Sequence, residues 1–156
     1  MLLDSFWIEK YFIETNQFCI GSASENNYDL KIIQVSDLHL KSLNTQLNSL
    51  AKTINKLKPD LVLITGDSVD DKKNIYILNQ FLGKIDKSIR KFAILGNWEY
   101  WGHVDLEALR LTYEENNCEL LINNSQQLTI NNKTVSITGI DDYVAGKADI
   151  ELAVKN

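Results

Sequence analysis

The chain has 156 residues, of which 44% are hydrophobic and 24% are charged, values typical of one soluble globular domain over residues 1–156. A formal net charge of −5 and the lack of a basic stripe exclude the electrostatic footprint of a nucleic-acid-binding protein. No apolar run approaches the ~20 residues of a membrane-spanning helix, and no signal peptide is visible. We therefore expect a cytoplasmic protein, with attachment at the membrane periphery as the alternative. Cys19 and Cys118 form no CxxC pair, which favours reduced thiols.

The first part of the chain alternates between strand and helix patterns. Short runs of β-branched and aromatic residues predict strands, and apolar side chains at helical spacing predict amphipathic helices. The elements predicted here are an edge strand at residues 6–14, strands at 31–36 and 61–65, and helices at 45–57 and 73–88. Pro59, the single proline, marks the end of the first helix. Asp70 and Asp71 are expected to cap the second helix.

The second part of the chain begins in the same way and ends in strands. The predicted elements are a strand at residues 92–95, a helix at 104–116, and strands at 118–122, 127–130 and 134–140. Asp105 is the expected N-cap of the helix, and Asn131-Asn132-Lys133 would turn the last two strands into a hairpin. The early strands are apolar throughout, which indicates a sheet covered on both faces and built from βαβ units. The predicted fold class is α/β, with a largely parallel sheet, flanking helices and the start of a second sheet.

Polar side chains follow three of the predicted strands directly. The first strand ends in Asp37-x-His39, the second in Gly66-Asp67 and the third in Gly96-Asn97. Because the carboxyl ends of parallel strands meet at one edge, we expect these side chains to lie together. Gly-Asp and Gly-Asn are also common in turns, so each pair alone is weak evidence. Carboxylate, imidazole and amide oxygen together suit Mn²⁺, Mg²⁺, Fe²⁺ or Zn²⁺.

Taken together, the blocks Asp37-x-His39, Gly66-Asp67-x-x-Asp70 and Gly96-Asn97-x-Glu99 resemble those of the bacterial calcineurin-like metallophosphoesterases. Gly139-Ile140-Asp141-Asp142 is similar to a later stretch of the same family, so the resemblance covers roughly residues 30–142. It implies the amino-terminal part of an α/β/β/α sandwich and a hydrolase of phosphomono- or diester bonds.

The resemblance also implies a mechanism with two divalent metal ions, which would be Mn, Fe, Zn or Mg. Asp37 and His39 would bind one metal, Asp67 would bridge both, and Asn97 would bind the second. Asp67 and Asn97 are thus the expected catalytic residues. Two such ions clamp the phosphoryl oxygens and lower the pKa of a water between them, which then attacks the phosphorus.

The sequence departs from the family pattern in two places. The third block of the family reads Gly-Asn-His, and here the third position is Trp98, whose indole cannot supply a catalytic proton. Family members also carry later histidine motifs, whereas this sequence holds only His39 and His103, and His103 is expected in a loop or cap. The domain is therefore expected to be incomplete at its carboxyl end. Trp98 is either a substrate-lining or a packing residue.

Several alternatives stay open at this stage. Glu99 would line the substrate site, orient a neighbour at the edge, or be a solvated loop carboxylate, and Asp141 and Asp142 are interpreted as turn residues. The main functional alternative is an inactive or partner-dependent fragment that binds at most one metal, completed by a carboxyl-terminal half or by oligomerisation. The expected substrate is a small-molecule or lipid-linked phosphoester. A receiver-like domain is disfavoured, because its acidic pair and lysine are not visible.

Overall fold

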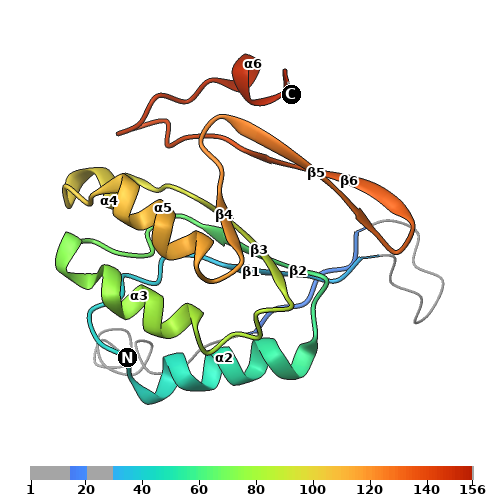
Figure 1. Cartoon of the computed structure of the whole chain (residues 1–156), viewed down its shortest axis with the longest axis horizontal. Helices are drawn as coiled ribbons and strands as arrows, with labels where there is room; N and C mark the ends of the chain where they lie inside the picture. Colours follow the sequence, from blue (N-terminus) through green and yellow to red (C-terminus); the bar gives the residue numbers. More distant parts are fainter. Residues whose placement is uncertain (1–14, 21–29, 156) are drawn as a thin grey trace, which may run out of the picture.

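The computed structural model describes residues 15–20 and 30–155 (Figure 1). The edge strand expected at residues 6–14 lies outside the described residues. Strands β1 (Ile32–Val35), β2 (Leu61–Thr65), β3 (Arg90–Ile94) and β4 (Cys118–Leu120) pair in parallel, in the order β1-β2-β3-β4. Their short apolar sequences predict this arrangement, because strands of a parallel sheet are covered on both faces. The parallel sheet is confirmed.

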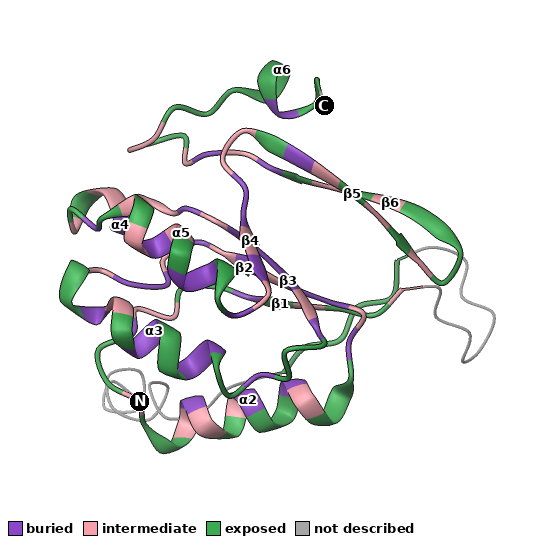
Figure 2. Cartoon of the chain, viewed as in Figure 1, coloured by how far each residue is buried: buried purple, intermediate pink, exposed green. Residues whose placement is uncertain are grey.

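The two faces of this sheet carry different layers. Helices α2 (Thr45–Leu57), α3 (Ile75–Leu82) and α5 (Leu106–Glu114) cover one face, and Figure 2 shows their buried sides turned toward the strands. Alternate residues of a strand face opposite sides, so Val62 and Ile64 pack in the larger core beneath the helices. Leu61 belongs to a smaller core on the opposite face, which the antiparallel hairpin of β5 (Asn124–Ile130) and β6 (Lys133–Gly139) covers.

Local signals in the sequence fix the ends of several elements. The α2 helix begins where the Asn44 side chain accepts a hydrogen bond from the amide of Leu47 at 2.9 Å. It ends at Lys58, which adopts a left-handed conformation (φ 49°) just before Pro59. Asp105 caps α5 as predicted, by accepting hydrogen bonds from two amides of its first turn.

The expected second helix is wrong at its carboxyl end. Residues Lys72–Asn74 form a 3-10 turn and α3 ends at Leu82, six residues before the predicted end at 88. Gly83 follows Leu82, and the Asp86 carboxylate accepts a hydrogen bond from the Ser88 amide in a turn of its own. Ile85 is still buried, so the apolar pattern continues beyond the helix without helical backbone.

The hairpin prediction is confirmed. Asn131 and Asn132 both have positive φ angles (50° and 63°), the conformation that a two-residue turn between twisted strands requires. Two short helices, α4 (Asn97–Trp101) and α6 (Ile150–Ala153), were not predicted, because four or five residues are too few for a periodic pattern. Within residues 15–20 and 30–155 no helix is both long and apolar enough to cross a membrane.

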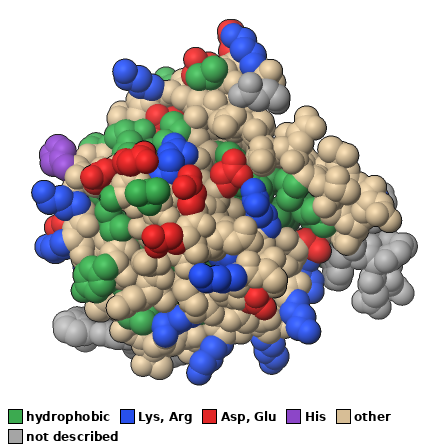
Figure 3. Space-filling model, in the orientation of Figure 1, with side chains coloured by type: hydrophobic (Ala, Val, Ile, Leu, Met, Phe, Trp, Pro, Cys, Tyr) green, Lys and Arg blue, Asp and Glu red, His purple; other side chains and the backbone are tan. Residues whose placement is uncertain are grey.

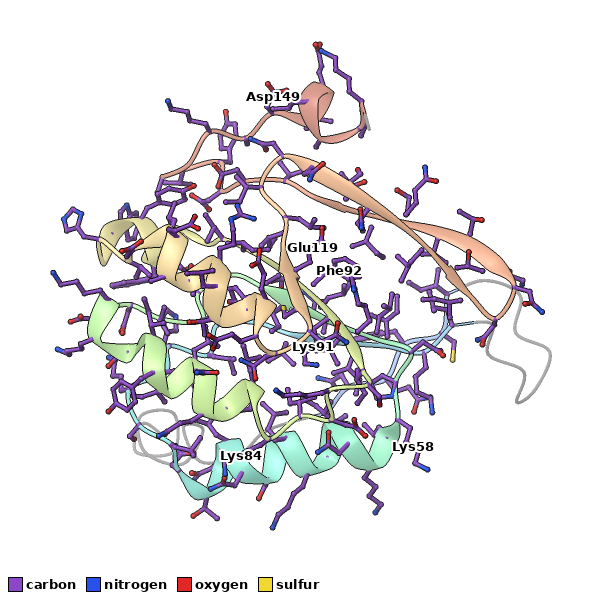
Figure 4. The ribbon with its side chains drawn as sticks, viewed as in Figure 1. Lys58, Lys84, Lys91, Phe92, Glu119 and Asp149 are labelled. Atoms are coloured by element: carbon purple, nitrogen blue, oxygen red, sulfur yellow. The ribbon has the colours of Figure 1, made fainter. Side chains whose placement is uncertain are left out.

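The two cysteines are free thiols in different surroundings. Cys19 is exposed, whereas Cys118 is buried in β4 beside Lys91 of β3. Figure 4 shows Phe92 on β3 near Glu119, its pairing partner on β4, and Lys91 further along β3. Burial raises the pKa of the Cys118 thiol to about 12.

The two thiols should therefore react with a thiol reagent at very different rates. The thiolate is the nucleophile, and at pH 8 the buried Cys118 carries almost none of it. We expect rapid titration of one thiol, Cys19, in native protein and of two thiols in denaturant. Rapid titration of both thiols in native protein would contradict the burial of Cys118.

Candidate metal centre

Three of the predicted ligands meet at the carboxyl edge of the sheet. One donor atom each from Asp37, His39 and Asp67 lies within 4.8 Å of the other two. Asp37 and His39 follow β1, Asp67 follows β2, and the parallel pairing of these strands brings their ends side by side. Asp37 is exposed and the other two are half-buried, so the cluster opens to solvent.

The backbone at these three positions is unusual. Asp37, His39 and Asp67 have φ angles of 54°, 42° and 52°, in the left-handed region that costs roughly 1–2 kcal/mol for a residue with a side chain. Hydrogen bonds between the two loops hold this conformation. The His39 amide donates to the Asp67 carbonyl at 2.9 Å, and the Leu40 amide donates to the Ser68 carbonyl at 2.9 Å. Strain maintained in this way is typical of functional sites.

Two glycines allow the second and third strand ends to approach each other. Gly66 has a φ of +84°, and a Cβ there would lie 2.8 Å from the Cα of Gly96. A Cβ at Gly96 would lie 2.2 Å from Oδ1 of Asp67. The Asp67 carboxylate therefore sits directly against the backbone of the β3–α4 turn, in space that only a residue without a side chain leaves open.

The buried Glu99 side chain connects the loop after β2 with the turn after β3. It is 1% exposed, so the interpretation as a solvated loop carboxylate is wrong. Its oxygens accept hydrogen bonds from the amides of Gly96, Asp67, Ser68 and Val69, at 2.9, 3.1, 2.6 and 3.2 Å. Burial raises the pKa of the Glu99 carboxyl, and the backbone donors oppose this shift. Glu99 thus ties the backbone of the Asp67 loop to the backbone of the Gly96 turn.

The structure gives a direct test of this role of Glu99. In Glu99→Gln an amide –NH₂ would replace one acceptor oxygen and face backbone N–H groups, which leaves buried donors unpaired. At about 1–3 kcal/mol for each unpaired group, we expect the free energy of unfolding to fall by about 2–4 kcal/mol. Urea denaturation measures this loss. The exposed Glu114→Gln on α5 serves as control, and equal stability of the two variants would contradict the role.

Asn97 and Trp98 begin α4 at the same edge. Asn97 is half-buried and stands between Gly96, which contacts Asp67, and Trp98, whose backbone N–H donates to Oδ1 of Asp67 at 3.0 Å. Trp98 is 41% exposed, and its ring centroid lies 5.6 Å from that of His39 in an edge contact. Both residues thus neighbour the three-ligand cluster.

The other acidic residues singled out in the sequence have structural partners. Asp71 caps the 3-10 turn through the Lys73 amide, as predicted. Asp70 does not cap it with a backbone contact: its carboxylate binds the Lys41 ammonium at 3.2 Å and the Asn74 amide at 3.3 Å. These side chains line an open pocket beside the loops that carry the ligands.

The turn interpretation of Asp141 and Asp142 agrees with their contacts. Asp141 accepts the Tyr100 hydroxyl at 2.7 Å, and Asp142 accepts the amides of Val144 and Ala145. His103 is exposed in the turn after α4, where a loop residue was expected.

The residues present fit a divalent cation. Two carboxylates and one imidazole within 4.8 Å offer oxygen and nitrogen donors of the kind that Mn²⁺, Fe²⁺ and Zn²⁺ take in proteins. A Ser36 hydroxyl hydrogen bond to the Asp37 carboxylate further fixes the orientation of that donor. The sequence did not predict Glu99 as the buried link between loops, although an acidic residue at the third position of a helix is a known capping signal. Here the Glu99 carboxylate accepts the N–H of Gly96, the N-cap residue of α4.

The chain is thus an α/β protein with a candidate metal-binding donor set at the carboxyl ends of its parallel strands, where open α/β sheets bind their ligands. The chain belongs to the calcineurin-like phosphoesterase family, whose sequence model matches residues 30–151. The resemblance inferred from the motifs is confirmed.

Three relatives illustrate the extent of the similarity. The chain is 31% identical over 125 residues to the uncharacterized metallophosphoesterase YkoQ of Bacillus subtilis, covering 78% of this chain and 46% of YkoQ. It is 32% identical over 140 residues to an uncharacterized metallophosphoesterase of Aquifex aeolicus, covering 86% and 49%. It is also 32% identical over 81 residues to the UDP-2,3-diacylglucosamine pyrophosphatase LpxG of Chlamydia muridarum, covering 49% and 25%. The chain spans about half the length of the first two.

Proposed function

We propose that this protein is a metal-dependent phosphoesterase that hydrolyses phosphomono- or diester bonds at the carboxyl edge of its parallel sheet. The cluster of Asp37, His39 and Asp67, with donor atoms within 4.8 Å of one another, carries the proposal. Membership of the calcineurin-like phosphoesterase family supports it independently.

The proposed ligand set follows the order of the strand ends. Asp37, His39 and Asp67 hold the first divalent ion, and Asp67 and Asn97 hold the second. Divalent ions bound there supply Lewis-acid stabilisation of phosphoryl oxygens and acidify water. The Trp98 amide and the Glu99 carboxylate fix Asp67 between the two positions, so its carboxylate is already oriented before any ion binds.

The proposed substrate is a small-molecule or lipid-linked phosphoester. Support for this class comes from the family and from one relative, LpxG, whose name describes a UDP-2,3-diacylglucosamine pyrophosphatase. Trp98 replaces the histidine of the family block and cannot donate a proton to a leaving group. A substrate whose leaving group needs little protonation is therefore favoured.

A second candidate function is a partner-dependent or inactive domain that binds at most one metal. The small number of histidine ligands favours this candidate. The sequence holds two histidines, and one of them, His103, is exposed in the turn beyond α4. A carboxyl-terminal half of the fold or a second copy would then complete the site. Sedimentation of the purified chain separates the candidates: a stable monomer with full metal-dependent activity argues against the second.

Metal-dependent turnover tests the proposed function. We expect hydrolysis of bis(p-nitrophenyl) phosphate by the purified chain with Mn²⁺, because nitrophenolate leaves without protonation. The rate should fall to background with excess EDTA and return when Mn²⁺ is restored. A folded sample without turnover under any of Mn²⁺, Mg²⁺, Fe²⁺ or Zn²⁺ would contradict the proposal and favour the second candidate.

A further inference from the structure

Two large aromatic side chains of α4 remain exposed next to the candidate metal centre. Trp98 is 41% and Trp101 is 55% exposed, whereas the large aromatic residues of the core, such as Phe81 and Tyr113, are at most 1% exposed. Figure 3 shows hydrophobic side chains reaching the surface, with acidic side chains among them, over the part of the molecule where Figure 1 draws α4 and α5. An exposed pair of indoles costs hydration free energy and is typical of a binding surface.

The pair is continuous with the metal donors. The His39 ring contacts the Trp98 ring at a centroid separation of 5.6 Å, and Trp98 contacts Trp101 at another 5.6 Å. The Trp98 backbone also donates to the carboxylate of Asp67. Ring contacts therefore connect a candidate metal-donor side chain, His39, to both exposed indoles.

The two indoles form a corner. Their planes meet at 72°, so a flat ring stacked on one indole would present its edge or face to the other, and both geometries are favourable for aromatic pairs. An aliphatic chain gains area from such a corner but has no orientation that matches both planes. The corner therefore favours a planar ring.

The helix that carries the corner is held from its opposite side. Glu99 accepts backbone hydrogen bonds beneath the edge, and the Tyr100 hydroxyl donates to Asp141 at 2.7 Å. Burial, together with the Asp141 carboxylate, raises the pKa of Tyr100, so its hydroxyl stays protonated and keeps donating. The inward side chains fix α4 while Trp98 and Trp101 face outward, so little ordering is needed when a ligand binds.

We propose that Trp98 and Trp101 form a binding site for a planar aromatic ring in the organic part of the phosphoester. This inference rests on the proposed function, because the phosphoryl group would be held at Asp37, His39 and Asp67. The ring would be an aryl group or a nucleobase. Trp101 acts as the specificity-determining residue, since it touches the organic part alone.

Calorimetric titration of the chain with Mn²⁺ and non-hydrolysable phosphonates tests this site. Phenylphosphonate should bind about tenfold more tightly than methylphosphonate, as expected for one or two aromatic contacts. Trp101→Ala should remove this preference and leave methylphosphonate binding unchanged, Trp101→Phe should restore most of it, and Tyr76→Ala, which removes an exposed aromatic side chain of α3, should change neither. The analogue of adenosine monophosphate with CH₂ in place of the bridging 5′-oxygen, used instead of phenylphosphonate, distinguishes a nucleobase from an aryl group.

The outcomes separate this inference from the proposed function. Mn²⁺-dependent binding of methylphosphonate with no gain from the phenyl ring overturns the ring site alone. Octylphosphonate binding more tightly than phenylphosphonate also overturns it, because the corner would then take an aliphatic chain. Phosphonate binding that does not depend on Mn²⁺, or no binding at all, overturns both proposals.

Discussion

Replacing Asp67 by Asn should reduce both Mn²⁺ affinity and metal-dependent turnover by about a hundredfold or more, since it removes the charge of the proposed bridging ligand. Asn has nearly the same shape, and its side-chain oxygen can still accept the Trp98 amide at the position of Oδ1. The variant should therefore still fold, but it should lose Mn²⁺ affinity and turnover. Initial rates of bis(p-nitrophenyl) phosphate hydrolysis and titration with Mn²⁺ measure the two losses.

Asp149→Asn is the matched control for this experiment. Asp149 lies at α6, far along the chain from the edge of the sheet, and caps that helix through the Leu152 amide (Figure 4). Asn caps a helix about as well as Asp, so the control should keep wild-type stability and turnover. Turnover of Asp67→Asn within threefold of this control would rule out Asp67 as a metal ligand.

Replacing Gly96 by Ala should damage the site and the fold together. The new Cβ would meet Asp67 Oδ1 at 2.2 Å and the Asp67 amide nitrogen at 2.7 Å, so either the carboxylate or the β3–α4 turn must move. Overpacking of this kind costs roughly 1–3 kcal/mol. We expect a loss of that size in the free energy of unfolding, with Mn²⁺ affinity reduced in the protein that remains folded.

Gly83→Ala provides the comparison at the end of α3. Gly83 has an ordinary φ of −62°, and the nearest atom to its added Cβ is the Asn79 carbonyl oxygen at 3.2 Å. Stability should change by less than about 1 kcal/mol, with Mn²⁺ affinity unaffected. Equal effects of Ala at both glycines would show that the crowding against Asp67 does not matter.

The elements that the sequence predicted well are those with local signals. The bounds of α2 follow from its apolar spacing and from the residues that cap it, and β2 is a single apolar run between polar neighbours. The end of α3 could not be predicted in this way. Ile85 continues the apolar spacing because it is buried by tertiary packing, while the backbone has already left the helix.

The same distinction between local signals and tertiary packing applies to the residues of the candidate site. Asp37, His39 and Asp67 could be brought together from the sequence, because the ends of parallel strands share one edge whatever the details of packing. The inward direction of Glu99 depends on α4, a helix of five residues without a periodic pattern. The contact between Trp98 and Trp101 depends on the same helix. Neither could be derived from spacing along the strands.

The position of bound Mn²⁺ in a crystal of this chain tests the central claim most directly. Anomalous scattering should give a manganese peak about 2.0–2.3 Å from a carboxylate oxygen of Asp37, a ring nitrogen of His39 and a carboxylate oxygen of Asp67. A second peak between Asp67 and Asn97 would support the two-metal form of the proposal. Manganese bound only elsewhere, with the Asp37, His39 and Asp67 side chains making no contact to it, would contradict the account.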